Sequence, residues 1–161
     1  MRVALILLLA LASGDWERVE SSDCGFALDF PGPVTLTTEP TEQGGVHRFY
    51  STARGRDNFS IGCTEWPAGV ERPDDSEAWL DEFDERAAAA DPGAEIRRVV
   101  VGGRPAQMTR SVYGSGEASL TVTHINLFTG SHLLSLGVAD FDATDEEVER
   151  FFGSLEILDA K

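Results

Sequence analysis

The amino-acid sequence predicts an α+β domain: a twisted, mostly antiparallel sheet of about six to eight strands with a helix packed on each face, an α/β/α sandwich. Two runs of about four strand-like segments are each followed by an amphipathic helical segment. Apolar residues occupy both parities of the last strand-like segments, which are therefore either bulged or buried on both faces, and burial on both faces fits a helix on each side of the sheet. The length of 161 residues, with 42% hydrophobic and 25% charged residues, suits a single globular domain.

The N-terminus has the arrangement of a secretory signal peptide. Arg2 precedes an apolar run over residues 3–12, which small residues follow. The run is about half as long as the roughly 20 apolar residues that a membrane span needs. We therefore expect a signal peptide at 1–14, a short linker at 15–23 and a single domain at 24–158. The protein is expected to be exported to the periplasm or the extracellular space, without membrane insertion after cleavage. A buried N-terminal strand is the alternative.

The chain contains two cysteines, Cys24 and Cys63. In an oxidising compartment such a pair is most simply a disulfide, which would close a loop of about 40 residues and constrain the unfolded chain by about 4 kcal/mol. Cys63 shares one face with Phe59 and Ile61, so its side chain is expected to point inward. Two buried thiols are the alternative. A metal site is not expected, because two thiols without histidine in ligand spacing cannot complete a tetrahedral shell.

The N-terminal third has the pattern of an antiparallel meander of about four strands. Phe26, Leu28 and Phe30 alternate along the first segment, and Pro31-Gly32-Pro33 ends it with a turn. Threonine and β-branched residues mark the next segments. The expected strands cover residues 25–30, 34–38, 46–52 and 58–66.

A helical period begins at Ser76 and ends at Pro92-Gly93. Asp74 stands three residues before Glu77, in the register of a capping box. The acidic outer face is interpreted as solvated surface. The expected apolar face consists of Trp79, Leu80, Phe83, Ala87 and Ala90.

Two hairpins and a second helix complete the expected fold. Gly102-Gly103 suits a two-residue turn between the first two strands, because glycine enters positive φ freely. Thr144 is expected to cap the last helix with Glu147. The four strands cover residues 96–101, 104–113, 119–128 and 132–139. The apolar stripe of the helix consists of Val148, Phe151, Phe152 and Leu155.

Short motifs in this order resemble the PsbP-like or Ran-release-factor-like fold group, which includes many exported bacterial proteins of unassigned role. They are Phe30-Pro31-Gly32, Gly102-Gly103-Arg104-Pro105-Ala106 and Phe151-Phe152-Gly153-Ser154-Leu155, together with the closing hairpin. The resemblance spans nearly the whole mature chain and implies an α/β/α sandwich that acts as an adaptor, assembly factor or envelope protein without catalysis. It implies no particular binding residue, because the group shares a scaffold and not a site.

Charge and motifs narrow the chemistry. A net charge of -15 repels nucleic acid, and the sequence has neither a phosphate-binding loop nor a Gly-x-Ser-x-Gly elbow. His47, His124 and His132 occur singly. A catalytic or metal role for His124 requires a carboxylate beside it, and a hydrogen-bonded strand histidine is the favoured interpretation. The acidic segment 140–145 lacks the glycine of a calcium loop and is interpreted as a turn and helix cap, with calcium binding at the surface as the alternative.

These features predict an exported, non-catalytic binding or adaptor domain that acts on another envelope or secreted component. We expect no catalytic, cofactor-binding or metal-binding residues and no cofactor, but we do expect a protein partner. The expected contact is a sheet face or the strand edge near Trp66. One alternative is a hydrolase whose site gathers scattered carboxylates around His124. A structural envelope protein is another.

Overall fold

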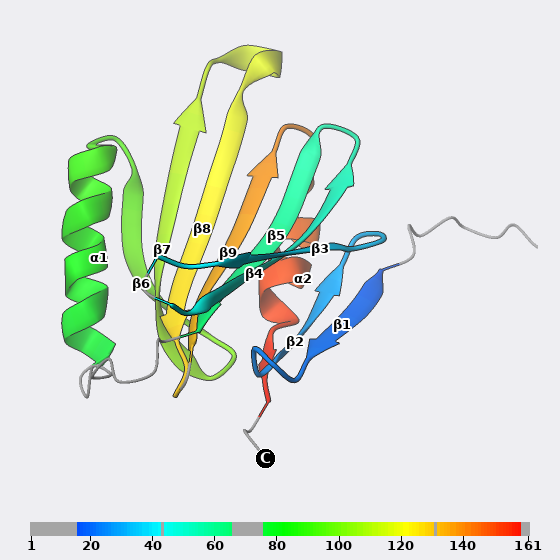
Figure 1. Ribbon diagram of the computed structural model, residues 1–161. Helices are drawn as coiled ribbons and strands as arrows, with labels where there is room; N and C mark the ends of the chain where they lie inside the picture. Colours follow the sequence, from blue (N-terminus) through cyan, green and yellow to red (C-terminus); the bar gives the residue numbers. More distant parts are fainter. Residues whose placement is uncertain (1–15, 43, 66–75, 131, 159–161) are drawn as a thin grey trace, which may run out of the picture.

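Figure 1 shows the computed structural model, which describes residues 16–42, 44–65, 76–130 and 132–158. The strands within these residues are β1 Glu17–Ser21, β2 Phe26–Phe30, β3 Thr35–Pro40, β4 Val46–Arg54, β5 Asp57–Glu65, β6 Glu95–Val101, β7 Arg104–Tyr113, β8 Leu120–Phe128, β9 His132–Asp140 and β10 Glu156–Ile157. The helices are α1 Ser76–Ala90 and α2 Asp145–Gly153, with a short 3-10 helix at Gly116–Ala118. The predicted α+β class is confirmed.

The larger sheet contains seven strands in the order β3-β4-β5-β9-β8-β7-β6. All its neighbouring strands are antiparallel, as predicted. The turn between β6 and β7 consists of Gly102 and Gly103, with φ of 57° and 75°, which is the left-handed conformation that the dipeptide suggests. Successive residues of each strand point to opposite faces, so this register decides which side chains meet on each face.

The prediction of a continuous N-terminal meander is wrong at its first strand. β2 pairs with β1 and β10 in a separate three-stranded sheet. Phe26, Ala27 and Leu28 are all fully buried, so both faces of β2 are covered and it does not lie at the edge of the larger sheet. Residues expected to be a linker form β1 instead, because they pair along the whole length of β2.

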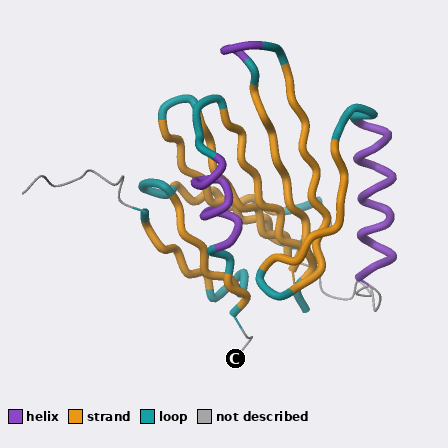
Figure 2. The backbone as a smooth tube through the Cα atoms, turned by 180° about the vertical axis from the view of Figure 1, so that it is seen from behind, coloured by secondary structure: helices purple, strands orange, loops and turns teal. Residues whose placement is uncertain are grey.

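The two helices lie on opposite faces of the larger sheet, as predicted. α2 lies behind that sheet in Figure 1 and in front of it in Figure 2. The Phe151 ring of α2 lies 5.4 Å, between ring centroids, from both Phe30 in β2 and Phe59 in β5. On the other face, Asp84 of α1 accepts a hydrogen bond from Gln107 of β7, with a donor–acceptor distance of 2.8 Å.

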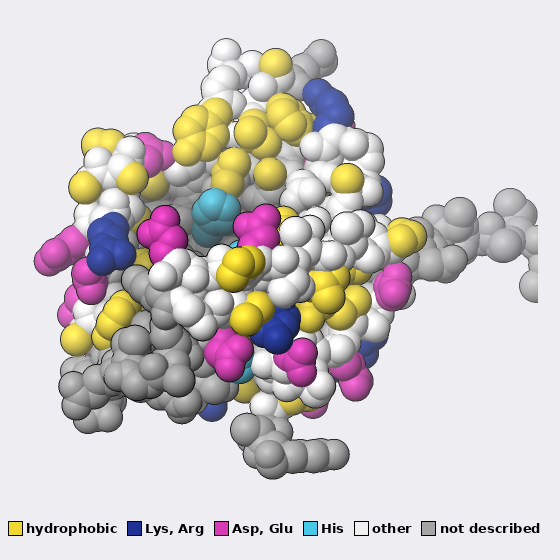
Figure 3. Space-filling view, viewed as in Figure 1, with side chains coloured by type: hydrophobic (Ala, Val, Ile, Leu, Met, Phe, Trp, Pro, Cys, Tyr) yellow, Lys and Arg dark blue, Asp and Glu magenta, His cyan; other side chains and the backbone are white. Residues whose placement is uncertain are grey.

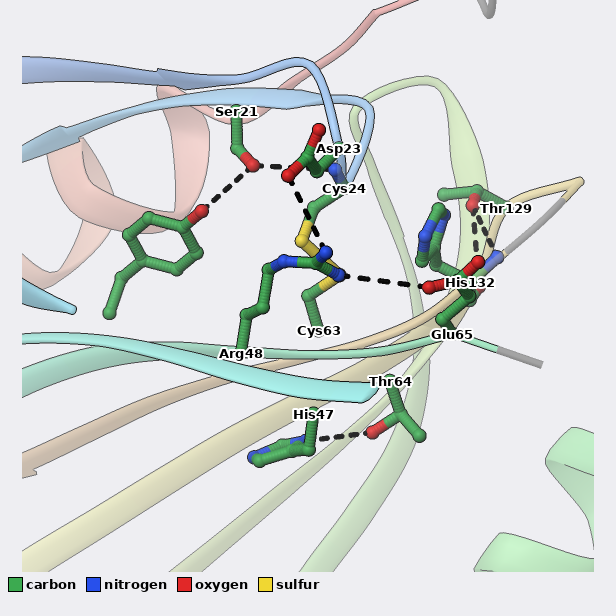
Figure 4. The surroundings of a disulfide bond; sticks show 11 residues. Ser21, Asp23, Cys24, His47, Arg48, Cys63, Thr64, Glu65, Thr129 and His132 are labelled. Atoms are coloured by element: carbon green, nitrogen blue, oxygen red, sulfur yellow. Dashed lines mark hydrogen bonds and ion pairs between the residues drawn. A yellow bond between two sulfur atoms is a disulfide. The ribbon is translucent and has the colours of Figure 1, made fainter. Parts of the chain in front are cut away.

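The predicted disulfide is confirmed and ties the two sheets together. Cys24 precedes β2, Cys63 lies in β5, and their Cα atoms are 6.0 Å apart. Both side chains are fully buried, so Cys63 points inward as expected. Arg48 lies beside the sulfur atoms (Figure 4), with ion-pair distances of 3.4 Å to Asp23 and 3.8 Å to Glu65.

The core lies between α2, the small sheet and the larger sheet. Its largest fully buried apolar side chains are Phe26, Phe30, Phe59, Phe151, Leu28, Ile61, Leu80, Leu127, Leu134, Leu136 and Val138. All of these except Leu80 of α1 belong to one continuous cluster.

Three expectations concern residues outside those that the structure describes. They are the signal peptide at 1–14, the capping role of Asp74 and the partner contact at Trp66. None of the described helices is long and apolar enough to cross a bilayer.

Candidate functional site

A groove of about 550 Å³ opens between α2 and the part of the larger sheet formed by β6, β7 and β8. The volume falls in the range of about 300–1,000 Å³ that is typical of ligand sites. The groove is lined by Arg97, Val99, Val100, Val101, Gly102, Met108, Arg110, Thr123, Ile125, Asp145, Val148, Glu149, Phe152 and Gly153. It thus joins strands and a helix that are distant in the sequence.

The floor of the groove is apolar because of strand register. Met108 lies opposite Ile125 in the β7–β8 pair, and both side chains point to the face that carries α2. They are 7% and 3% exposed, so the floor is already well packed. Val99 and Val101 extend this apolar surface to β6, the edge strand.

α2 supplies the opposite wall through one helical stripe. Asp145, Val148, Glu149 and Phe152 follow i, i+3, i+4, i+7 spacing and all line the groove. The apolar stripe expected for this helix therefore divides in two. Phe151 is buried in the core, whereas Val148 and Phe152 are only partly buried and face the groove.

Charged groups line both walls of the groove. On the sheet side, Arg97 forms an ion pair with Glu95 at 3.4 Å. Arg110 interacts electrostatically with Asp140, whose pKa is raised by burial and by repulsion from Asp57, an effect that Arg110 opposes. The acidic groups around Arg110 thus partly compensate its charge.

The carboxylates of the α2 wall, unlike Arg97, are not compensated by a nearby opposite charge in an ion pair among the described residues. Within the described part of the chain, Asp145 and Glu149 form no ion pair or side-chain hydrogen bond. A carboxylate at the first position of a helix, such as Asp145, is stabilised by the helix dipole, whereas Glu149 lies too far along α2 for this effect. The α2 wall therefore carries an exposed carboxylate, Glu149, that forms no ion pair among the described residues.

A second surface lies on the opposite face of the larger sheet, beside α1. A chain of hydrogen bonds crosses this face. Ser135 Oγ donates to Asn126 Oδ1 at 2.7 Å, Asn126 Nδ2 donates to Gln107 Oε1 at 3.1 Å, and Gln107 Nε2 donates to Asp84 at 2.8 Å. Arg98 Nε also donates to Asp84. These hydrogen bonds connect the middle of the sheet to α1. They also engage the side-chain polar groups of Asn126 and Gln107.

His124 lies on this second surface. Figure 3 views the molecule from this side and shows a hollowed surface with apolar side chains above the hollow. A Cβ at Gly137 would lie 3.0 Å from His124 Cδ2 and 3.1 Å from Ser60 Oγ, so glycine lets both side chains lie over β9. His124 is exposed, yet burial of part of its ring lowers its pKa and favours the neutral imidazole.

The structure separates the groups that a site at His124 would need. No carboxylate of the described residues forms a hydrogen bond or ion pair with His124, and burial is the cause of its pKa shift. The expected hydrogen-bonded strand histidine is found instead at His47, whose Nδ1 lies 2.9 Å from Thr64 Oγ1. His132 is buried near the disulfide (Figure 4).

Segment 140–145 forms the predicted turn and helix cap. Thr144 Oγ1 accepts a hydrogen bond from the backbone N–H of Glu147, whose carboxylate accepts one from the backbone N–H of Thr144. Asp57 accepts hydrogen bonds from the backbone N–H groups of Phe141 and Asp142. Among the described residues, no group of three or more His, Cys, Asp or Glu side chains could hold a metal ion.

Sequence reasoning missed the groove, although one signal was available. The spacing of Asp145 and Glu149 along α2 places both beside Val148 and Phe152. That pattern mixes charge with apolar residues on one stripe, which is unusual for a stripe that faces a closed core.

No protein-family model matches the chain, and no curated protein is similar to it in sequence. Fold and site nevertheless define a class: a disulfide-bonded α+β domain with a seven-stranded antiparallel sheet and a surface groove between that sheet and a helix.

Proposed function

We propose that the protein is an exported, non-catalytic binding domain that holds a segment of another envelope or secreted protein in the groove between α2 and β6–β8. The observation that carries this proposal is the groove itself, with its apolar floor and its charged side chains on both walls. Concave, mostly apolar surfaces with a few polar groups are typical of binding sites. A protein segment suits this site because the groove borders β6, the edge strand of the sheet.

Two further features support the proposal. The Cys24–Cys63 disulfide favours an oxidising compartment, and hence export. Membership of the PsbP-like or Ran-release-factor-like fold group is also proposed, on the sequence motifs and the antiparallel sheet between two helices. That group would imply an adaptor, assembly factor or envelope protein.

The experiment fills the groove without disturbing the core. A Cβ at Gly153 would meet no atom within 4 Å, so Gly153→Trp places a large side chain in the groove. Gly130 has the same open space but does not line the groove, so Gly130→Trp is the matched control. Each purified protein is used to capture partners from an envelope extract of the native host, after cross-linking.

We expect a discrete protein to be captured by the wild type and by Gly130→Trp, but about tenfold less by Gly153→Trp. Circular dichroism and thermal unfolding establish that both variants are folded. Equal capture by all three proteins, or capture of no specific protein, would refute the proposal.

A hydrolase centred on His124 is the second candidate, and one observation favours it. Burial of part of its ring favours the neutral imidazole of His124, which can accept a proton. Its test is hydrolysis of generic ester and peptide substrates by the wild type and by His124→Ala. Equal or undetectable rates would exclude it. The structural envelope protein stays a prediction, tested by self-association and copy number.

A further inference from the structure

We infer that the partner segment carries basic residues next to its apolar residues, and that the α2 wall of the groove selects them. This inference rests on the proposed function. It goes further in stating the chemistry of the occupant: Leu- or Val-like side chains against the partly buried Val99, Val148 and Phe152, and a Lys or Arg opposite Glu149.

Charge complementarity carries the inference. The groove has basic groups on its sheet wall and acidic groups on its helix wall. The sheet wall is partly neutralised within the chain, since Arg97 pairs with Glu95 and Arg110 interacts with Asp140. Within the described residues, Asp145 and Glu149 form no ion pair with these arginines or with any other basic group. A bound cation would therefore find an acidic group that is not already engaged.

The net charge of the whole molecule also favours a basic partner segment. A net charge of -15 attracts basic segments and repels acidic ones before contact. This long-range effect is common to the entire surface, whereas Glu149 acts only within the groove. The experiment therefore has to separate the local effect from the general one.

Two glutamates of α2 provide that separation. Glu149 lines the groove, and Glu146 lies on the same helix, is exposed and does not line the groove. Glu149→Gln and Glu146→Gln change the net charge equally. The probes are three synthetic 12-residue peptides that share one pattern of leucine and valine and carry two Lys, two Gln or two Glu residues at the same positions. Isothermal titration calorimetry measures their affinity for the disulfide-bonded protein.

We expect the affinity order Lys, then Gln, then Glu peptide. Glu149→Gln should weaken binding of the Lys peptide by about two- to fivefold, and it should leave the Gln peptide unchanged. Glu146→Gln should alter the affinity for the Lys peptide by less than half of that factor. Added salt should weaken binding of the Lys peptide to the wild type more than to Glu149→Gln.

The contrary outcomes distinguish the inference from the function on which it rests. If the Gln peptide binds and the Lys peptide binds no better, the inference fails and the groove remains a binding site. If both glutamate variants weaken the Lys peptide equally, net charge and not the groove is responsible, and the inference again fails. If no peptide binds and Gly153→Trp captures the same proteins as the wild type, the proposed function fails as well.

Discussion

α1 and α2 have similar predicted amphipathic patterns but are attached to the sheet in different ways. Phe151 of α2 is fully buried and contacts the rings of Phe30 and Phe59, so α2 belongs to the main core. α1 buries Leu80 completely, but Leu80 is outside that core cluster. The other side chains that attach α1 include the ring contacts Trp79–Phe128 and Phe83–Phe128 and the polar bonds of Asp84 and Asp91.

The difference shows that periodicity predicts a helix but not how strongly it is held. A helix that shares a core with two sheets is lost only when the domain unfolds. A helix that is attached at one side, mainly by hydrogen bonds and a small aromatic group, can open on its own.

Truncation of the core anchor of α2 should have the largest effect. Phe151→Ala removes a fully buried ring and should lower the free energy of unfolding by about 3–5 kcal/mol. Leu80→Ala is the counterpart in α1 and should cost about 2–3 kcal/mol. Urea unfolding measures both values. Equal losses in the two variants would mean that α1 is as much a part of the core as α2.

The disulfide should come next, because it ties the small sheet to the larger one on the α2 side. Replacing both Cys24 and Cys63 by Ala should lower the free energy of unfolding by about 2–4 kcal/mol. Hydrogen exchange should then quicken in β1 and β2 relative to α1. A loss of protection confined to α1 would contradict this assignment.

Much of the fold could be predicted because its signals are local. The Gly102-Gly103 turn, the Thr144–Glu147 capping box and the amphipathic helices all depend on residues close together in the sequence. The pairing of β2 with β10 could not be predicted in this way, since β10 lies more than a hundred residues further along the chain. Alternation in β2 gives the strand but not its partner, because that partner is set by packing.

The candidate site was harder to predict from the sequence, because its residues are also distant along the chain. The groove joins Val99, Ile125 and Val148, which lie on three separate elements. Their apolar character is the same as that of core residues, and only the open space beside them distinguishes the two. On this face Ile125 of β8 is buried, whereas Val99 and Val101 of β6 are only partly buried, so the cover over this part of the sheet is incomplete. How far it extends is a property of the tertiary arrangement.

Loss of the hydrogen bond between α1 and the sheet should lower the free energy of unfolding by a smaller amount. Asp84→Ala leaves the Gln107 side chain, which is 1% exposed, without its acceptor and should cost about 1–3 kcal/mol. Asp81→Ala removes only an exposed ion pair with Arg98 and should cost less than about 1 kcal/mol. Hydrogen exchange in Asp84→Ala should quicken in α1 and not in α2. Uniform quickening across the domain would show that α1 does not open independently.

Lowering the pH should also distinguish the two helices, with a smaller change in stability than the substitutions above. The hydrogen bond from Arg54 lowers the pKa of Glu147 at the start of α2, as does the backbone N–H of Thr144. A lowered pKa in the folded state means that the stabilisation is complete above the unfolded pKa of about 4.3 and is lost as the pH falls through the folded pKa.

Glu147→Gln preserves the capping box but removes the charge, so its free energy of unfolding should fall less steeply with acid than that of the wild type. The difference should be below about 1 kcal/mol, since the pair with Arg54 is partly exposed.

The hydrogen bond from Ser111 likewise lowers the pKa of Asp91, at the end of α1. In Asp91→Asn, the hydrogen-exchange protection of α1 alone should therefore decrease less than in the wild type as the pH falls. In Glu147→Gln, the free energy of unfolding of the whole domain should decrease less as the pH falls. Identical pH profiles for local and global opening in both variants would place the two helices in a single cooperative unit and remove the contrast between them.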